Sequence, residues 1–142
     1  MSVLVKHMMS SPVVTFFAEQ TLPLAEDVMK YKHIRHLPVV DDRRRVVGLV
    51  SHRDLLAAQI SNRSGVARDI ARAIQEEVRV AQVMTRDVMT IGPDVNASIA
   101  AGTLLDHKFG CLPVVDDQGV LVGIVTEHDF LRFATKILET TD

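Results

Sequence analysis

The polar residues best placed to do chemistry stand in two matching stretches, GLVSHRD (48–54) and GIVTEHD (123–129). In each, a run of strand-forming residues ends at a hydroxyl side chain, Ser51 or Thr126, and an aspartate follows three positions later. This spacing is typical of a capping box, in which hydroxyl and acid exchange hydrogen bonds with backbone amides at a helix start. It also suits a ligand, because a helix N-terminus attracts phosphate and a carboxylate accepts hydrogen bonds from ribose hydroxyls. Spacing alone leaves both interpretations open.

The two stretches belong to an internal repeat. The six residues LPVVDD occur at 37–42 and again at 112–117, which is 75 positions later. At the same offset, 16 of the 54 positions in 5–58 are identical, and no gap is needed. Self-similarity over this length indicates architecture before any single residue can be given a role. The chain is therefore predicted to consist of two copies of one structural unit.

Each copy predicts the same order of elements. A short extended segment (12–16 or 87–91) is followed by a helix, for which Thr21 or Asn96 is the candidate N-cap. LPVVDD then predicts a buried strand and a turn, a second strand completes a hairpin, and a last helix begins near the aspartate. The predicted fold class is α/β (α+β), with the order β-α-β-β-α twice. Units this small are expected to pack together as one module with pseudo-twofold symmetry.

Apolar residues at helical spacing support these helices. Leu24, Val28 and Tyr31 recur at this spacing in the first copy, and Ile99, Leu104 and Leu105 form a less regular stripe in the second. Apolar residues within 66–78 predict an amphipathic helix between the copies. The expected domains are repeat 1 (1–62), a helical connector (63–78) and repeat 2 (79–142).

Composition narrows the function classes. The chain has 142 residues, of which 47% are apolar and 24% charged, as in soluble globular proteins. We expect a cytoplasmic protein without a membrane partner, because no apolar run approaches the roughly 18 residues of a spanning helix and Lys6 and His7 interrupt any signal-peptide core. The single cysteine, Cys111, suits a reducing compartment.

Three other functions find little support in the sequence. No Walker loop, dinucleotide fingerprint or nucleophile–base pair is present, so we expect no enzyme. The six histidines and Cys111 lack tight metal-ligand spacing, and Cys111 is expected to be a core residue rather than a nucleophile. The basic run 43–45 is expected to be a solvated turn. Without tryptophan, and with one tyrosine, the chain offers few aromatic platforms for nucleic acid.

The doubled pattern of an extended V-x-T segment, a helix, LPVVDD, G-[LI]-V-[ST]-x-x-D and a second helix resembles a pair of CBS domains over roughly 1–60 and 78–138. The resemblance implies a Bateman module, whose two clefts between the repeats bind adenosine-containing ligands and which regulates rather than catalyses. The implied ligands are AMP, ADP, ATP, NAD and S-adenosylmethionine, with AMP or ATP expected first. No other cofactor is expected.

The resemblance also implies roles for single residues. Asp54 and Asp129 would hold ribose hydroxyls, and Ser51 and Thr126 would lie beside ribose or phosphate. The other implied ligand residues are Thr15 and Thr90 next to the base, and, near phosphate, Arg35, His36 and Arg53 in the first copy against His128 and Lys108 in the second. Because guanidinium groups bind phosphate strongly, the two sites are expected to differ in affinity.

The two halves of the chain also differ in net charge. Residues 1–75 carry 11 Lys/Arg against 7 Asp/Glu, whereas residues 76–142 carry 5 against 11. The basic half could hold an anion, the halves could attract each other, or surface charge could have drifted after duplication.

The main hypothesis is thus a regulatory module, present as a homodimer, that senses an adenine nucleotide and signals to an effector protein still unknown. The homodimer is expected because amphipathic helices flank the sheets. The alternative is a protein-interaction or dimerisation module of the same fold that binds no nucleotide.

Overall fold

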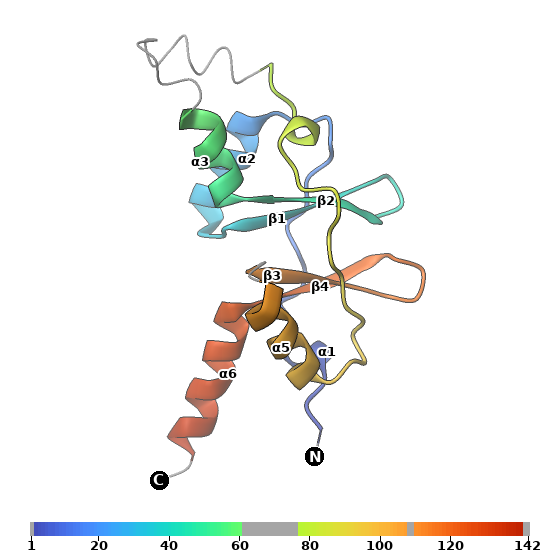
Figure 1. Cartoon of the computed structure of the whole chain (residues 1–142), viewed down its shortest axis with the longest axis vertical. Helices are drawn as coiled ribbons and strands as arrows, with labels where there is room; N and C mark the ends of the chain where they lie inside the picture. Colours follow the sequence, from blue (N-terminus) through green and yellow to red (C-terminus); the bar gives the residue numbers. More distant parts are fainter. Residues whose placement is uncertain (1, 61–76, 108–109, 141–142) are drawn as a thin grey trace. The chain divides into compact units, whose positions relative to one another are not determined.

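In the described part of the chain, two antiparallel hairpins, one from each repeat, form two sheets. In this computed structural model, which describes residues 2–60, 77–107 and 110–140, β1 (His36–Val40) pairs with β2 (Val46–Ser51), and β3 (Cys111–Val115) pairs with β4 (Leu121–Thr126). The LPVV residues are buried in β1 and almost entirely buried in β3. The predicted buried strand and hairpin are therefore confirmed in both repeats (Figure 1).

The helices follow the predicted order. Helices α2 (Leu22–Lys32) and α3 (His52–Ile60) contact the β1–β2 hairpin, whereas α5 (Ala97–His107), α6 (Glu127–Glu139) and the short α1 (Val5–Met8) contact the β3–β4 hairpin. A single 3-10 turn, η1 (Val80–Gln82), precedes the second repeat's extended segment. The two repeats are thus built alike, each with a hairpin and two main helices.

The extended segments predicted to open each repeat do not form regular strands. Phe16 makes one parallel bridge with Val39, and Ile91 makes one with Val114. Each bridge has two backbone hydrogen bonds, of 2.9 and 3.0 Å. The predicted short segments do pair with the hairpins, but through one residue each, because the chain passes from one compact unit to the other within these segments.

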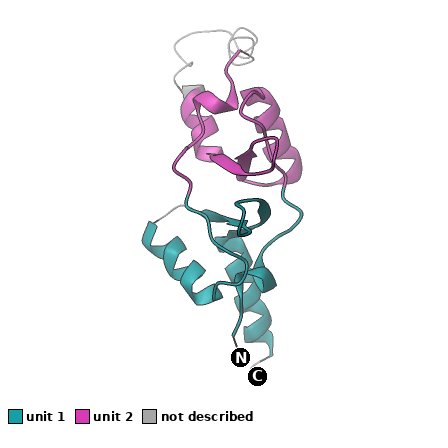
Figure 2. Ribbon diagram, turned by 90° about the vertical axis from the view of Figure 1, so that its right-hand side faces the viewer, with its two compact units in different colours: residues 1–13, 89–142 teal, residues 14–88 magenta. Residues whose placement is uncertain are grey.

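Each compact unit contains the opening segment of the other repeat; we call these two opening segments the exchanged segments. One unit comprises residues 14–88, and the other comprises residues 1–13 and 89–142 (Figure 2). In the second of these, the Val5 amide donates to the Val95 carbonyl at 2.8 Å, and Ser10 pairs with Ile124 through hydrogen bonds of 2.9 and 3.1 Å. The N-terminal segment therefore completes the unit built around the second repeat.

Residues 78–88 do the same for the first repeat. The Val80 amide donates to the Gln20 carbonyl at 2.7 Å, and Thr85 pairs with Leu49 through two hydrogen bonds of 2.9 Å. Each folded unit therefore lacks the opening segment of its own repeat and contains that of the other repeat. The predicted connector helix falls largely on residues up to 76, which lie outside the described residues.

Each exchanged segment places a methionine against a hairpin glycine. A methyl group on Gly48 would overlap the sulfur of Met84, and one on Gly123 would overlap the sulfur of Met9. Glycine permits this close approach, because a Cβ at either position would force the methionine side chain to move.

Each unit has its own hydrophobic core. The buried members in the unit of residues 14–88 are Phe16, Leu22, Ala25, Met29, Leu37, Val39, Val50, Leu55, Val80 and Met84. Those in the other unit are Val5, Ala100, Leu104, Leu112, Val114 and Val125. Both cores include a residue of the exchanged segment, so hydrophobic burial holds that segment in place.

The core-facing side of α2 is not the stripe that helical spacing suggested. Leu22, Ala25 and Met29 are buried, whereas Leu24 and Tyr31 are 44% and 81% exposed. In α5 likewise, of the three residues in the expected stripe only Leu104 is buried. Both helices therefore present apolar side chains on their outer faces.

The two candidate N-caps behave differently. Asn96 caps α5 with its side chain, since its Oδ1 accepts the Ser98 amide at 2.9 Å. Thr21 occupies the N-cap position of α2, but its side chain makes no capping hydrogen bond. Proline near the start of α2 removes one amide that would otherwise need a partner.

The two hairpin turns share one backbone conformation, which has a steric cost in the first repeat. Asp41 Oδ1 accepts the amides of Arg43 and Arg45 at 2.9 Å, and Asp116 makes the equivalent pair of bonds. At the turn position with positive φ, the first repeat has Arg44 (φ 60°) and the second has Gly119 (φ 82°). Only glycine adopts this backbone conformation without steric cost.

We predict that two glycine-to-alanine changes act in opposite directions. Gly119→Ala should lower the free energy of unfolding by about 1 kcal/mol, because φ is positive there. Gly102→Ala, inside α5 where a Cβ would meet no atom within 4 Å, should raise it by about 0.5–1 kcal/mol. Urea denaturation followed by circular dichroism measures both, and equal effects of the two substitutions would contradict the described backbone.

Candidate functional site

The stretch 48–54 contains the end of β2 and the start of α3, and a complete capping box joins the two. The Ser51 amide donates to Asp54 Oδ2 at 2.8 Å, and the Asp54 amide donates to Ser51 Oγ at 3.2 Å. Asp54 is half-buried. Among the residues that the structure describes, no hydrogen bond reaches its other oxygen, Oδ1. One carboxylate oxygen thus holds the helix start, and the other remains available to a ligand.

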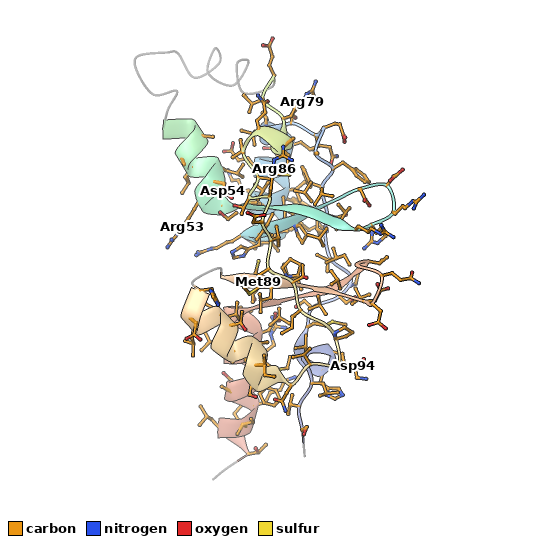
Figure 3. All side chains as sticks on the ribbon, turned by 45° about the vertical axis from the view of Figure 1, so that its right-hand side comes forward. Arg53, Asp54, Arg79, Arg86, Met89 and Asp94 are labelled. Carbon is orange, nitrogen blue, oxygen red and sulfur yellow. The ribbon has the colours of Figure 1, made fainter. Side chains whose placement is uncertain are left out.

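Candidate phosphate-binding residues surround the start of α3. His36 pairs with Ser51 across the hairpin, and the Arg35 carbonyl accepts the His52 amide at 2.8 Å. Arg53 precedes Asp54 on the same helix end (Figure 3), and its side chain is exposed. The structure therefore brings five of the predicted site residues together here: Ser51, Asp54, Arg53, Arg35 and His36.

The equivalent aspartate in the other unit has a different environment. Asp129 is 4% exposed, and its Oδ2 accepts the Thr126 amide at 2.8 Å and the Thr126 hydroxyl at 3.3 Å. Its Oδ1 accepts a hydrogen bond from the Ser10 hydroxyl at 2.9 Å and lies 3.8 Å from Arg132 Nη1. Both oxygens of this carboxylate are therefore occupied within the protein, and a buried carboxylate needs such partners.

Charges around α6 also differ from those around α3. Glu127 stands where the first repeat has His52, and His128 stands where it has Arg53. The positions equivalent to Arg35 and His36 are Gly110 and Cys111, the second of which is the first residue of β3, so this side offers neither an arginine nor a histidine there. Lys108, the other candidate cation, lies outside the described residues.

The two threonines expected beside the base lie along the hairpins rather than at the helix starts. Thr15 is half-buried and Thr90 is exposed, each one residue before the bridge to β1 or β3. In the described part of the chain, no hydrogen bond joins Thr15 to Asp54 or Thr90 to Asp129.

Cys111 is a core residue, as predicted. Its side chain is buried at the start of β3, and desolvation raises the pKa of the thiol to about 12. The thiol therefore stays protonated at neutral pH, and thiolate chemistry is unavailable to it.

Two further observations concern metals and membranes. Within residues 2–60, 77–107 and 110–140, no three His, Cys, Asp or Glu side chains gather in a way that could hold a metal ion. None of the helices in the same part of the chain combines the length and apolar character that crossing a membrane requires.

Sequence reasoning missed Ser10. It lies 119 positions from Asp129, and the two meet only because the N-terminal segment joins the unit of the second repeat. The sequence did contain one hint, because Ser10 and its counterpart Thr85 both carry a hydroxyl directly after an aligned methionine.

Comparison with known proteins identifies the repeated unit. The family model of the CBS domain matches residues 5–61 and 80–136. Homoserine O-acetyltransferase of Methanohalophilus mahii is 32% identical over 123 residues, which are 86% of this chain but 22% of that enzyme. The chain thus spans only about a quarter or less of the first relatives that it matches.

Solved structures match over nearly the full length. AcuB, a candidate acetoin utilization protein from Vibrio cholerae, is 37% identical with a TM-score of 0.83, over 98% of this chain and 95% of that one. The CBS domain pair of protein MJ0100, in complex with 5'-methylthioadenosine and S-adenosyl-L-methionine, is 27% identical (TM-score 0.80, 96% and 99% covered). CBSX2 in complex with AMP is 30% identical (TM-score 0.79, 94% and 97% covered). With its two matched repeats, the chain belongs to the CBS domain family.

Proposed function

We propose that the protein is a regulatory module that binds an adenosine-containing ligand, with Asp54 as the principal ribose contact. The similar CBS pairs of MJ0100 and CBSX2 were crystallised with such ligands, the first with 5'-methylthioadenosine and S-adenosyl-L-methionine and the second with AMP. The observation in this chain that carries the proposal is the open Oδ1 of Asp54 at the start of α3.

The chemistry at Asp54 suits a ribose. A carboxylate accepts several hydrogen bonds, and only Oδ2 is engaged by the Ser51 amide, so a ribose hydroxyl can donate to Oδ1. Bonds to an ionised acceptor are stronger than neutral ones. Ser51 holds the carboxylate in place before the ligand arrives, which reduces the entropy lost on binding.

A phosphate would favour the same end of the unit. Arg35 and Arg53 carry permanent positive charge, and the N-terminal end of α3 adds the positive pole of its dipole. Glu127 opposes a phosphate at the corresponding place in the other repeat. We therefore assign a phosphate-bearing nucleotide, AMP or ATP, to Asp54 in preference to Asp129.

The proposed role is sensing rather than catalysis. A ligand that binds one conformation better shifts the protein toward it by no more than that difference in affinity. We propose that the shift is passed to an effector protein in the cytoplasm, and that bound nucleotide is not turned over.

A homodimer is part of the proposal. Tyr31 on α2 and Leu105 on α5 are 81% and 80% exposed, and Leu24 and Ile99 on the same two helices are exposed as well. Exposed apolar patches of this kind mark interaction surfaces. The same faces support the second candidate function, a dimerisation or interaction module without a nucleotide.

We predict that Asp54→Asn weakens AMP binding at least tenfold and leaves the fold intact. Asparagine can still accept the Ser51 amide but loses the open anionic oxygen, and hydrogen bonds to charged groups contribute about 1.5–3 kcal/mol. Isothermal titration calorimetry measures affinity, and circular dichroism checks the fold. Wild-type protein that shows neither calorimetric binding nor a rise in melting temperature with millimolar AMP, ADP, ATP, NAD or S-adenosylmethionine would favour the second candidate.

Arg53→Gln separates phosphate from ribose recognition. We expect it to lower AMP affinity by about tenfold, since one charge-assisted contact is lost, and to leave the affinity for 5'-methylthioadenosine, which has no phosphate, unchanged. Competition titrations with the two ligands provide the comparison. Equal losses for both would show that Arg53 does not act on phosphate.

The dimer is tested at its apolar faces. Tyr31→Lys combined with Leu105→Lys should convert a dimer into monomers in sedimentation velocity, while both side chains are too exposed for their loss to disturb the core. Met89→Lys is the control, because Met89 is exposed and apolar but lies outside the helices. A monomeric wild-type chain at micromolar concentration would contradict the proposal.

A further inference from the structure

The Ser10 hydroxyl binds the carboxylate oxygen of Asp129 whose counterpart in Asp54 accepts no hydrogen bond within the described residues. It donates to Oδ1 at 2.9 Å, and the remaining donors around the carboxylate are the Thr126 amide, the Thr126 hydroxyl and, at 3.8 Å, Arg132 Nη1. A carboxylate has about four acceptor sites. With the Asp129 side chain 2% exposed, little of it is left for a ligand to reach.

Backbone bonds keep Ser10 in this place. Its amide donates to the Ile124 carbonyl at 2.9 Å, and its carbonyl accepts the Ile124 amide at 3.1 Å. The neighbouring Met9 lies against Gly123, and Val5 is buried in the core of the same unit. Ser10 is therefore part of a packed segment, and its hydroxyl is pre-positioned on the carboxylate.

The other repeat supplies an internal comparison. Thr85 holds the equivalent position and makes the same pair of backbone bonds, to Leu49, both at 2.9 Å. Its side chain is nevertheless exposed, and across the described residues it makes no hydrogen bond to Asp54. Ala57 stands in place of Arg132, so Asp54 also lacks that neighbour. Identical backbone pairing thus leaves one carboxylate open and the other closed.

We propose that Ser10 closes the second ligand site by donating to Asp129 in place of a ribose hydroxyl, so that this CBS pair binds one adenosine ligand per chain. The inference rests on the proposed function for the identity of the ligand. The Ser10 hydroxyl acts at the ribose contact, so it affects ligands with and without phosphate, unlike the difference in positive charge between the two sites. A ligand at Asp129 would have to displace the Ser10 hydroxyl from the carboxylate.

The test counts ligands with Ser10→Ala and 5'-methylthioadenosine, an uncharged probe that does not depend on the phosphate-binding residues. In calorimetry, we expect one ligand per wild-type chain and two per Ser10→Ala chain. The double variant Ser10→Ala/Asp54→Asn should keep one site of unweakened affinity, whereas Asp54→Asn alone should retain only a site at least tenfold weaker than that of the wild-type chain. Thr85→Ala is the matched control at the equivalent position and should keep the wild-type stoichiometry of one.

The outcomes separate this inference from the proposed function. Two ligands per wild-type chain, or a Ser10→Ala chain with unchanged stoichiometry, would overturn the role of Ser10 even if Asp54 binds as proposed. A third outcome is that the wild-type chain binds no ligand and the Ser10→Ala chain binds one. This outcome would refute the site at Asp54 and support the role of Ser10. No binding by either chain would refute both.

Discussion

The hydrogen bonds between a carboxylate and the amide three residues before it determine how each hairpin meets its following helix. Asp54 and Asp129 both make this bond at 2.8 Å. The helix start, the end of the hairpin and the candidate ligand contact are therefore one structure. A substitution that removes the carboxylate removes a helix cap as well as a ligand contact, and only an isosteric change can separate the two roles.

The first repeat and the second use this common structure differently. Around Asp54 the chain leaves one oxygen open and adds arginines, whereas around Asp129 it buries the side chain and surrounds it with its own donors. A buried carboxylate fully bonded within the protein stabilises local structure, and a half-buried one with a spare oxygen can bind. The backbone of the repeat is shared, and the side chains around it decide which role each aspartate takes.

Much of this fold could be predicted from the sequence, because the LPVVDD strands, the turns and the capping boxes depend on neighbours only a few residues apart. The buried face of α2 could not, since Leu22, Ala25 and Met29 compete with a second apolar stripe, and periodicity does not tell which one faces the core. The pairing of each first segment through a single residue and the Ser10–Asp129 bond depend on where distant segments meet. The ligand residues Thr15 and Thr90 came from the family resemblance and remain predictions.

The exchange of leading segments bears on how such a chain could arise. Each compact unit takes residues from both repeats, and its core includes Val80 or Val5 from the exchanged segment. An ancestral single repeat with this chain path would have completed its core only in a segment-swapped dimer, in which each molecule packs its opening segment into the core of the other. Gene duplication would then have joined a swapped pair of molecules into one polypeptide, freeing each copy of the aspartate to diverge.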